Sequence, residues 1–455
     1  MHHFQKQQHS NQNHHKHTVH RKREKSLGLL ELIAIALGGM VGGGIFTILG
    51  ISVSMIGVYT PLAMILGGVI ASFAAYSYIK LGIYYKQEGE SYIFVRKTFY
   101  DYPFASALIG WWVIFGYIST LALYAFTFSS YAIADFSDSY LIKIAVAGLV
   151  LFFFVLVNIW SVKGMGKLED IMVYSKLIIL AIISFVLINN SNTSLPTLIE
   201  NQGSTDLFSI LIVASVTFVA YEGFQLIINA INEMEEPAKN IRRSIYISIA
   251  LATLIYTVIA FGAILAISFE DIIANKEYAL ASGANKVLGN IGNDLVVFGA
   301  LLATSSAISG TVFGASRQMS IIANDGLMPK FLSKRNENNI PANAIITMSF
   351  LAFCLICSGS LKLILEFGSI TFLIVCLMVT ISNFKIRKST NSSTFILICA
   401  ILVLSFSSFL ILYYEITTDI YQIYFILLLY FLLTIGAVFY SKKVSHDENT
   451  KNQEI

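Results

Sequence analysis

Residues 29–50 form an apolar stretch that is long enough to cross a lipid bilayer but carries glycines at its centre. A membrane span needs about 20 apolar residues, and it stays helical because lipid offers no hydrogen-bond partner to backbone groups. Each glycine inside a helix costs about 1 kcal/mol relative to alanine. The stretch therefore predicts a helix that breaks at mid-membrane, which is tolerated only beside protein or a polar cavity. The glycines at its midpoint are Gly38, Gly39, Gly42, Gly43 and Gly44.

The same glycines are compatible with close helix packing. Gly38 and Gly42, and likewise Gly39 and Gly43, have the spacing of the small-xxx-small motif found at contacts between membrane helices. This stretch by itself does not separate the two interpretations. The rest of the chain favours a binding site.

Further apolar segments follow, so we predict an all-α membrane protein with twelve transmembrane helices. Hydrophobic residues make up 56% of the 455 residues and charged residues 13%, whereas soluble domains carry about 25% charged residues. The predicted spans are 29–50, 58–79, 105–131, 141–160, 171–189, 207–231, 245–268, 294–316, 341–359, 363–382, 394–414 and 420–440.

Both ends of the chain are predicted to be cytoplasmic tails. Residues 1–26 are polar and rich in histidine, which predicts a disordered tail, and residues 441–455 form a shorter one. Lysine and arginine are concentrated in the loops on the side of these tails. By the positive-inside rule, that side faces the cytoplasm of a multi-pass cell (cytoplasmic) membrane protein. The opposite side carries Lys143, Lys276, Lys286 and Lys362.

Two connecting segments are apolar enough to be more than loops. Residues 87–104 predict a short interfacial segment before the third span. Residues 269–293 predict a longer outer loop that lies over the external mouth. A solvated connector is the alternative for each.

The sixth span carries a second interruption at mid-membrane. Glu222 lies directly before Gly223 inside an apolar run, and charged groups at this depth usually face a cavity or a partner. Spans one and six are five spans apart, as in inverted five-helix repeats whose broken first helices form a site at the midplane. This predicts a first repeat over 27–190, a second over 207–382 and two peripheral helices over 394–440.

Two broken helices provide both electrical poles of a binding site. The N-terminus of a half-helix carries partial positive charge and binds carboxylates. The C-terminus of a half-helix and unwound carbonyls bind cations or amines. A site with both poles fits a zwitterion, and an amino acid is the obvious small candidate.

Lys176 is a further charged residue inside a predicted span. It lies close to the start of the apolar run, so its side chain could extend to the membrane interface. Alternatively it is buried, where its charged form is disfavoured, and it loads and releases a proton during transport. A buried lysine could also act as a tethered cation where another transporter would hold Na⁺.

Several motifs resemble those of the amino acid–polyamine–organocation (APC) superfamily of permeases, over nearly the whole chain after the N-terminal tail. In span one, GGMVGGGIF is similar to the family's G-x-x-I-G-x-G-I-F. In span six, FVAYEGFQ followed by EMEEPAKNIRRSI resembles the aromatic-x-Gly-Phe-Glu segment and its following loop. After span eight, GASRQMSIIANDGLMPKFLSK resembles S-R-x-x-x-x-x-A-x-D-G-x-x-P, and EGESYIFVRKTF loosely matches Gly-Gly-x-Tyr.

The resemblance implies a ten-helix inverted-repeat core plus two extra helices, and secondary active transport of amino acids by alternating access. By analogy, the amides of Gly43 and Gly44 would hold the substrate carboxylate. The carbonyls near Met40, Val219 and Glu222 would hold its amino group. The implied substrate-binding residues are Met40, Gly42, Gly43, Gly44, Ile45, Val219, Glu222 and Gly223.

Lys176 falls where proton-coupled members of the family carry a lysine, which favours proton over sodium coupling. The family's glutamate after Gly-Phe is Gln225 here, and the position before Gly223, often apolar, is Glu222. The Glu222 carboxylate could favour cationic substrates, pair with Lys176, take part in proton coupling or cap the broken helix.

Other polar and aromatic residues in the spans leave two interpretations open. Thr304, Ser305 and Ser306 could be Na⁺ ligands or hydrogen-bond donors between helices. A second set could line the pocket or belong to an aromatic core: Trp111, Trp112 and Tyr117.

We therefore predict an amino acid permease, a proton symporter, whose partners are an amino acid substrate, a coupling proton and the lipid bilayer. An exchanger of cationic amino acids or polyamines is the first alternative, and an amino-acid sensor on a transporter fold is the second. The spans show no nucleophile–base pair or set of metal ligands, so we predict no enzyme, no metal and no cofactor. Nucleic acid is not a predicted partner.

Overall fold

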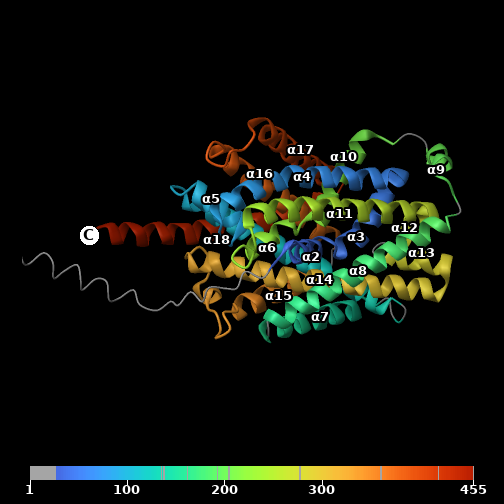
Figure 1. Ribbon diagram of the computed structural model, residues 1–455, viewed down its shortest axis with the longest axis horizontal. Coiled ribbons are helices and arrows are strands. Elements are labelled where there is room, and N and C mark those ends of the chain that lie inside the picture. The colour runs from blue at the N-terminus through green and yellow to red at the C-terminus, as the bar shows by residue number, and fades with distance from the viewer. Residues whose placement is uncertain are drawn as a thin grey trace, which may run out of the picture.

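The computed structural model describes residues 27–453 except 135, 137–138, 161, 192, 203–204, 276–277, 359–360 and 419. Within these residues the chain is helical, and β pairing is limited to an isolated bridge between Leu27 and Met234. Most of the long helices run roughly along one axis, side by side (Figure 1). The predicted His-rich tail lies outside the described residues.

The helices that carry the candidate site come from both halves of the chain. The elements in the first half are α2 (Leu29–Met40), α3 (Gly43–Ile56), η1 (Gly57–Tyr59), α4 (Thr60–Tyr85), α5 (Glu90–Thr98), α6 (Pro103–Ile133), α7 (Tyr140–Trp160), α8 (Val162–Asn189), α9 (Leu195–Gln202), α10 (Leu207–Val216) and η2 (Thr217–Tyr221). Those in the second half are η3 (Phe224–Ala230), α11 (Pro237–Ala266), α12 (Phe269–Asn275), α13 (Ala279–Leu288), α14 (Asn290–Asn324), η5 (Lys330–Ser333), α15 (Ala342–Cys357), α16 (Leu361–Lys385), α17 (Thr394–Thr418) and α18 (Ile420–Gln453).

The described residues contain ten helical segments that are long and apolar enough to cross a membrane. One of them, Gly43–Tyr85, joins α3 to α4 through η1, whereas Leu29–Met40 and Ala342–Cys357 are shorter apolar helices. The first predicted span therefore corresponds to α2 and α3 together, because its glycines divide it. The twelve-span layout, the inverted repeat and the domain boundaries remain predictions.

The connecting segments contain short helices. Residues 87–104 include α5, and residues 269–293 include α12 and α13. Helix α9 follows α8 and was not predicted, and α18 continues through most of the predicted tail 441–455. Figure 1 shows α5 and the C-terminal end of α18 at one end of the molecule and α9, α12 and α13 at the other.

Large apolar side chains cover the outside of the peripheral helices. Leu149 and Phe152 of α7 are 67% and 60% exposed, and Phe431 of α18 is 62% exposed. A helix that presents such residues outward fits a lipid environment, because lipid and the side chains are equally apolar. By contrast, α2 packs against α8, α11, α14 and η3, so the first broken helix lies inside the bundle.

Candidate functional site

The helix of the first span is interrupted where its glycines cluster. Helix α2 ends at Met40 and α3 begins at Gly43. Between them Val41 has φ −83° and ψ 74°, and Gly42 has φ −119° and ψ −146°, both outside the helical region. The C-terminus of α2 and the N-terminus of α3 therefore meet inside the protein, with all residues from 36 to 50 buried.

The sixth span is interrupted at the predicted position. Helix α10 ends at Val216 and continues as the 3₁₀ turns of η2, after which Glu222 is extended, with φ −66° and ψ 137°. Gly223 has φ +125°, which only glycine adopts readily, and η3 starts at Phe224. Gly223 therefore allows the non-helical backbone conformation that separates η2 from η3.

The two interruptions touch each other through their backbones. A Cβ atom on Gly223 would lie 2.7 Å from the carbonyl carbon of Gly39 and 2.8 Å from the nitrogen of Met40. A Cβ on Gly39 would lie 3.1 Å from Cα of Gly223. Both interpretations of the glycines therefore hold, since they break the helices and also let the broken backbones approach.

The other glycines of the first break also sit against neighbouring elements. A Cβ on Gly42 would lie 2.6 Å from Cβ of Ala307 in α14, and one on Gly43 would lie 2.9 Å from Thr127 in α6. A Cβ on Gly44 would lie 3.3 Å from Cα of Ala220. The start of α3 is thus packed closely against α6, α14 and η2.

Side chains from three helices satisfy the carbonyls at the C-terminal end of α2. Lys176 of α8 donates to Gly38 O at 3.3 Å and to Val41 O at 2.7 Å. Tyr124 of α6 donates to Gly39 O at 3.1 Å, and Tyr256 of α11 donates to Met40 O at 2.7 Å. A helix end that lacks its own hydrogen-bond partners is stabilised by such donors, and a cation there also interacts favourably with the helix dipole.

Lys176 is fully buried and does not extend to the membrane interface. An ammonium group has three N–H donors. Here they are directed to Gly38 O, Val41 O and Ser306 Oγ, the last at 2.6 Å. Lys176 therefore connects the broken end of α2 to α14.

A carboxylate lies on the same side of α8 as Lys176. Glu169 is 6% exposed and interacts electrostatically with Lys176. Its Oε1 lies 2.9 Å from where a Cβ would stand on Gly38 and equally far from where one would stand on Gly310. Glycine at these two positions makes room for this acid.

Tyr256 links the two breaks directly. Its hydroxyl lies 2.7 Å from Met40 O and 2.8 Å from Ala220 O, so one donor serves the ends of both broken helices. Two of the carbonyls that the resemblance assigns to a substrate amino group already accept hydrogen bonds within the protein. Met40 O accepts from Tyr256, and Val219 O accepts from the amide of Glu222 at 3.2 Å.

We expect Tyr256→Phe to weaken the connection between the breaks. Loss of the hydroxyl removes its hydrogen bonds to Met40 O and Ala220 O, although Met40 O still accepts from the Gly42 amide at 2.9 Å. A lost hydrogen bond of this kind costs about 0.5–1.5 kcal/mol. The matched control is Tyr221→Phe, which removes a hydroxyl that donates to Met64 O in α4 at 2.6 Å, away from the break in α2. Transport and thermal unfolding of both variants would be measured. Equal loss of transport in the two variants would contradict a specific role for Tyr256.

The amide ends predicted for the substrate carboxylate are at the start of α3. Gly43, Gly44 and Ile45 are its first three residues, so their N–H groups have no acceptor within the helix. All the predicted substrate-binding residues are buried at one of the two breaks, and the structure brings both groups together.

Glu222 contacts Gln225 rather than Lys176. Gln225 Nε2 donates to Glu222 Oε1 at 2.7 Å, while Gln225 Oε1 accepts from the Gly223 amide at 3.2 Å. The three donors of Lys176 are directed elsewhere, so the pairing of Glu222 with Lys176, one of the alternatives for this carboxylate, is not formed. Gln225 therefore links the side chain of Glu222 to the backbone of Gly223 at the second break.

The remaining candidates are divided between the site and its surroundings. Ser306 contacts Lys176, whereas Thr304 donates to Ala300 O of its own helix at 2.7 Å. Trp111 donates to Leu327 O, and Trp112 packs on Tyr430 of α18. These two tryptophans therefore lie away from the breaks. Of the three aromatic candidates, Tyr117 is the one that extends toward the breaks.

Several contacts could not be found from sequence patterns. Tyr124 and Tyr256 are two of many tyrosines in apolar runs, so their pattern carries no signal. Glu169 precedes Lys176 by seven residues, a helical spacing that places both on one face. This spacing is the sequence signal that could have identified Glu169 as a neighbour of Lys176.

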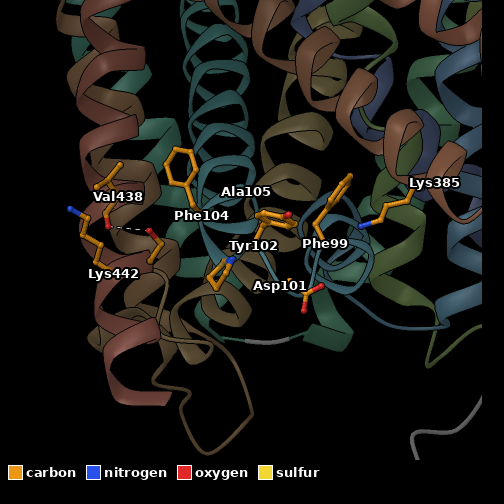
Figure 2. A pocket seen from close by; sticks show the side chains of 10 residues that line it. Phe99, Asp101, Tyr102, Phe104, Ala105, Lys385, Val438 and Lys442 are labelled. Carbon is orange, nitrogen blue, oxygen red and sulfur yellow. Dashed lines mark hydrogen bonds between the residues drawn. The ribbon is translucent and has the colours of Figure 1, made fainter. Parts of the chain in front are cut away.

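A surface cavity of about 1110 Å³ lies elsewhere. Figure 2 shows it between the segment that joins α5 to α6, the C-terminal part of α18 and Lys385 at the end of α16. It is lined by aromatic and charged residues outside the two breaks, so its residues are not part of the candidate site. The labelled lining residues are Phe99, Asp101, Tyr102, Phe104, Ala105, Lys385, Val438 and Lys442.

A helical bundle with two interrupted spans in contact inside it is typical of membrane transport proteins. The family model for amino acid permeases matches residues 27–452, almost all of the described chain, and the chain belongs to this family. It is accordingly a multi-pass membrane transporter of amino acids and not an enzyme.

Transport proteins are also among its relatives. Inner membrane transport protein YbaT of Escherichia coli is 29% identical over 386 residues, covering 84% of this chain and 88% of the relative. The large neutral amino acids transporter small subunit 2 of Rattus norvegicus is 26% identical over 379 residues, covering 77% and 68%. An uncharacterized protein of Methanocaldococcus jannaschii is 29% identical over 425 residues, covering 92% and 96%.

Proposed function

We propose that this protein is a secondary active transporter that carries amino acids across the cell membrane by alternating access and in symport with protons. Both termini face the cytoplasm in this proposal, as the distribution of lysine and arginine predicts. The observation that carries the proposal is the burial of Lys176 against the broken end of α2, with all three ammonium donors used.

The Lys176 contacts explain how a proton could be coupled to movement. The ammonium form supplies three donors and a positive charge at the C-terminus of α2. A neutral amine has two donors and no charge, so it holds two carbonyls and the Ser306 hydroxyl less well. Loss of the proton therefore weakens the contact of α2 with α8 and α14, which leaves the half-helix free to shift.

The free amides at the start of α3 support an amino acid as the substrate. Gly43 and Gly44 would direct N–H groups to its carboxylate, with the helix dipole adding to the attraction. The relative from Rattus norvegicus is named for large neutral amino acids, which supports this substrate class. Movement of the two breaks apart would be required to open space between them, because their backbones are in contact.

A cationic amino acid or polyamine exchanger is the second candidate. The observation that favours it is Glu222, a carboxylate 3% exposed at the second break, which accepts a hydrogen bond from the Gln225 side-chain amide and has no cation partner among the described residues. A positively charged side chain of the substrate would compensate this charge.

Uptake into proteoliposomes separates these candidates. The purified protein would be given a labelled mixture of the common amino acids under an inward proton gradient or an inward sodium gradient. We expect accumulation with protons alone. Accumulation that requires sodium would contradict proton coupling, and uptake that requires preloaded amino acids would favour the exchanger. Binding without uptake in any condition would indicate a sensor.

A further inference from the structure

A further buried carboxyl group lies at the α5 end of the molecule, outside the predicted site. Glu90 is the first residue of α5, and its side chain is 0% exposed. Its φ is +32°, in the left-handed region that favours glycine. In the Gly-Gly-x-Tyr motif that this stretch resembles, the second glycine falls at the position of Glu90. The backbone conformation therefore does not explain why a glutamate is present.

The Glu90 carboxyl is held on one oxygen only. Oε1 accepts from the hydroxyl of Tyr117 in α6 at 2.8 Å and from Nδ2 of Asn229 in η3 at 2.9 Å. Oε2 is buried and has no hydrogen-bond partner among the described residues. A buried charge with an unsatisfied oxygen is costly, and uptake of a proton removes the charge.

The same hydrogen-bond network reaches the second helix break. The Tyr117 hydroxyl accepts from Nε2 of Gln225 at 3.1 Å, and this nitrogen also donates to Glu222 Oε1 at 2.7 Å. Gln225 is joined to the backbone of the break through the Gly223 amide. Two buried carboxyl groups are therefore connected through one tyrosine and one glutamine.

The surroundings of Glu90 favour its neutral form. Burial raises the pKa of the Glu90 carboxyl to about 7, although the hydrogen bonds from Tyr117 and Asn229 act in the opposite direction. The titratable groups that interact with it electrostatically come from three helices and the second break: Tyr78 of α4, Tyr117 of α6, Cys376 of α16 and Glu222.

Among the described residues, no lysine or arginine is one of the groups that shift the pKa of Glu90. Gln318 of α14 donates to Gly89 O at 3.3 Å. Arg96 of α5 pairs with Asp325 at 3.1 Å, so this cation already has a carboxylate partner.

We propose that Glu90 is a proton-binding site through which the α5 end of the molecule controls the helix break at Glu222 and Gly223. A charged Glu90 holds the Tyr117 hydroxyl and repels the Glu222 carboxylate. Protonation removes the repulsion and weakens the hold on Tyr117, so that Tyr117 and Gln225 can rearrange around Glu222. The consequence for transport rests on the proposed function, whereas the binding of the proton does not.

Thermal unfolding of the purified full-length protein against pH tests the proton site. A carboxyl group whose pKa is higher in the folded state holds more protons there, so stability falls as pH rises. We expect the melting temperature of the wild type to fall from about pH 4.5 to about pH 7, the interval between the two pKa values. Glu90→Gln keeps the shape without the charge and should lose this component of the fall.

The matched control is Glu88→Gln in the same connection, where Glu88 is contacted by Asn232 at 2.7 Å on the exposed side. It should keep the wild-type profile. A Glu90→Gln profile that overlays the wild type would overturn the proposal. If that variant does not fold, Glu90→Gly, which relieves the positive φ, should give the same flattened profile.

Binding of the labelled amino-acid mixture tests the link to the break. A shift of one pKa unit on binding corresponds to a tenfold change in affinity. We expect affinity to change by about this factor across neutral pH in the wild type and to stay constant in Glu90→Gln. If Glu90→Gln keeps the wild-type pH dependence of binding, Glu90 does not control the second break. Failure of uptake in every gradient would instead overturn the proposed function, and the melting profiles would still test the proton site.

Discussion

Gly223→Ala is expected to abolish transport and to destabilise the protein by several kcal/mol. A side chain at φ +125° is strained by about 1–3 kcal/mol. The added Cβ would also lie 2.7 Å from the carbonyl carbon of Gly39, so a backbone would have to move rather than a flexible side chain. Overpacking of this kind costs about a further 1–3 kcal/mol. The measurements are thermal unfolding and uptake of labelled amino acids.

Gly289→Ala is the matched control for this variant. Gly289 has φ +66°, also unfavourable for a side chain, but no atom lies within 4 Å of the position of its Cβ. It therefore isolates backbone strain from close approach, and we expect a cost of about 1–2 kcal/mol with transport retained. If the two variants lose the same stability and both transport normally, the contact between the breaks is not required for function.

Lys176→Ala is expected to abolish proton-driven accumulation while equilibrium binding of amino acids remains. The variant removes the group that would carry the coupling proton. It also leaves Gly38 O and Val41 O without their donor, at about 1–3 kcal/mol for each buried carbonyl. Uptake under a proton gradient, binding and thermal unfolding would be measured together, because lower stability alone must not be taken for loss of coupling.

Ser306→Ala serves as the partial control for Lys176. It removes one of the three contacts of the ammonium group but keeps both carbonyls and the charge. We expect reduced uptake that still depends on the proton gradient. Accumulation by Lys176→Ala with the pH dependence of the wild type would show that the proton binds elsewhere.

The glycine cluster in the first span and the pair Glu222–Gly223 were sufficient to predict both interruptions. The reason is that a glycine or a charge inside an apolar run is costly in a membrane helix, so the pattern itself indicates an exception. Helix ends were less predictable. The predicted spans 171–189 and 420–440 agree with the apolar parts of α8 and α18, which are Ile171–Asn189 and Ile420–Val444. The helices themselves are longer, since α8 begins at Val162 and α18 continues to Gln453, because polar residues extend a helix beyond the membrane without any change of periodicity.

Sequence reasoning could place Lys176 in a span but could not choose between its burial and an interfacial position. The choice depends on α2 and α14, which supply two carbonyls and one hydroxyl from residues more than a hundred positions away. The role of Glu90 was missed for the same reason, because its partners Tyr117 and Asn229 lie on other elements.

The sequence by itself determined the membrane class, the family resemblance, the two helix breaks and the residues that form them. These follow from composition, from runs of apolar residues and from local motifs, all of which are properties of neighbouring positions. Only the tertiary structure decided that the two breaks touch, that Tyr256 serves both, and that Lys176 and Glu90 are buried. Hydrogen bonds and burial between distant segments depend on how helices pack, and packing is not encoded in any single segment.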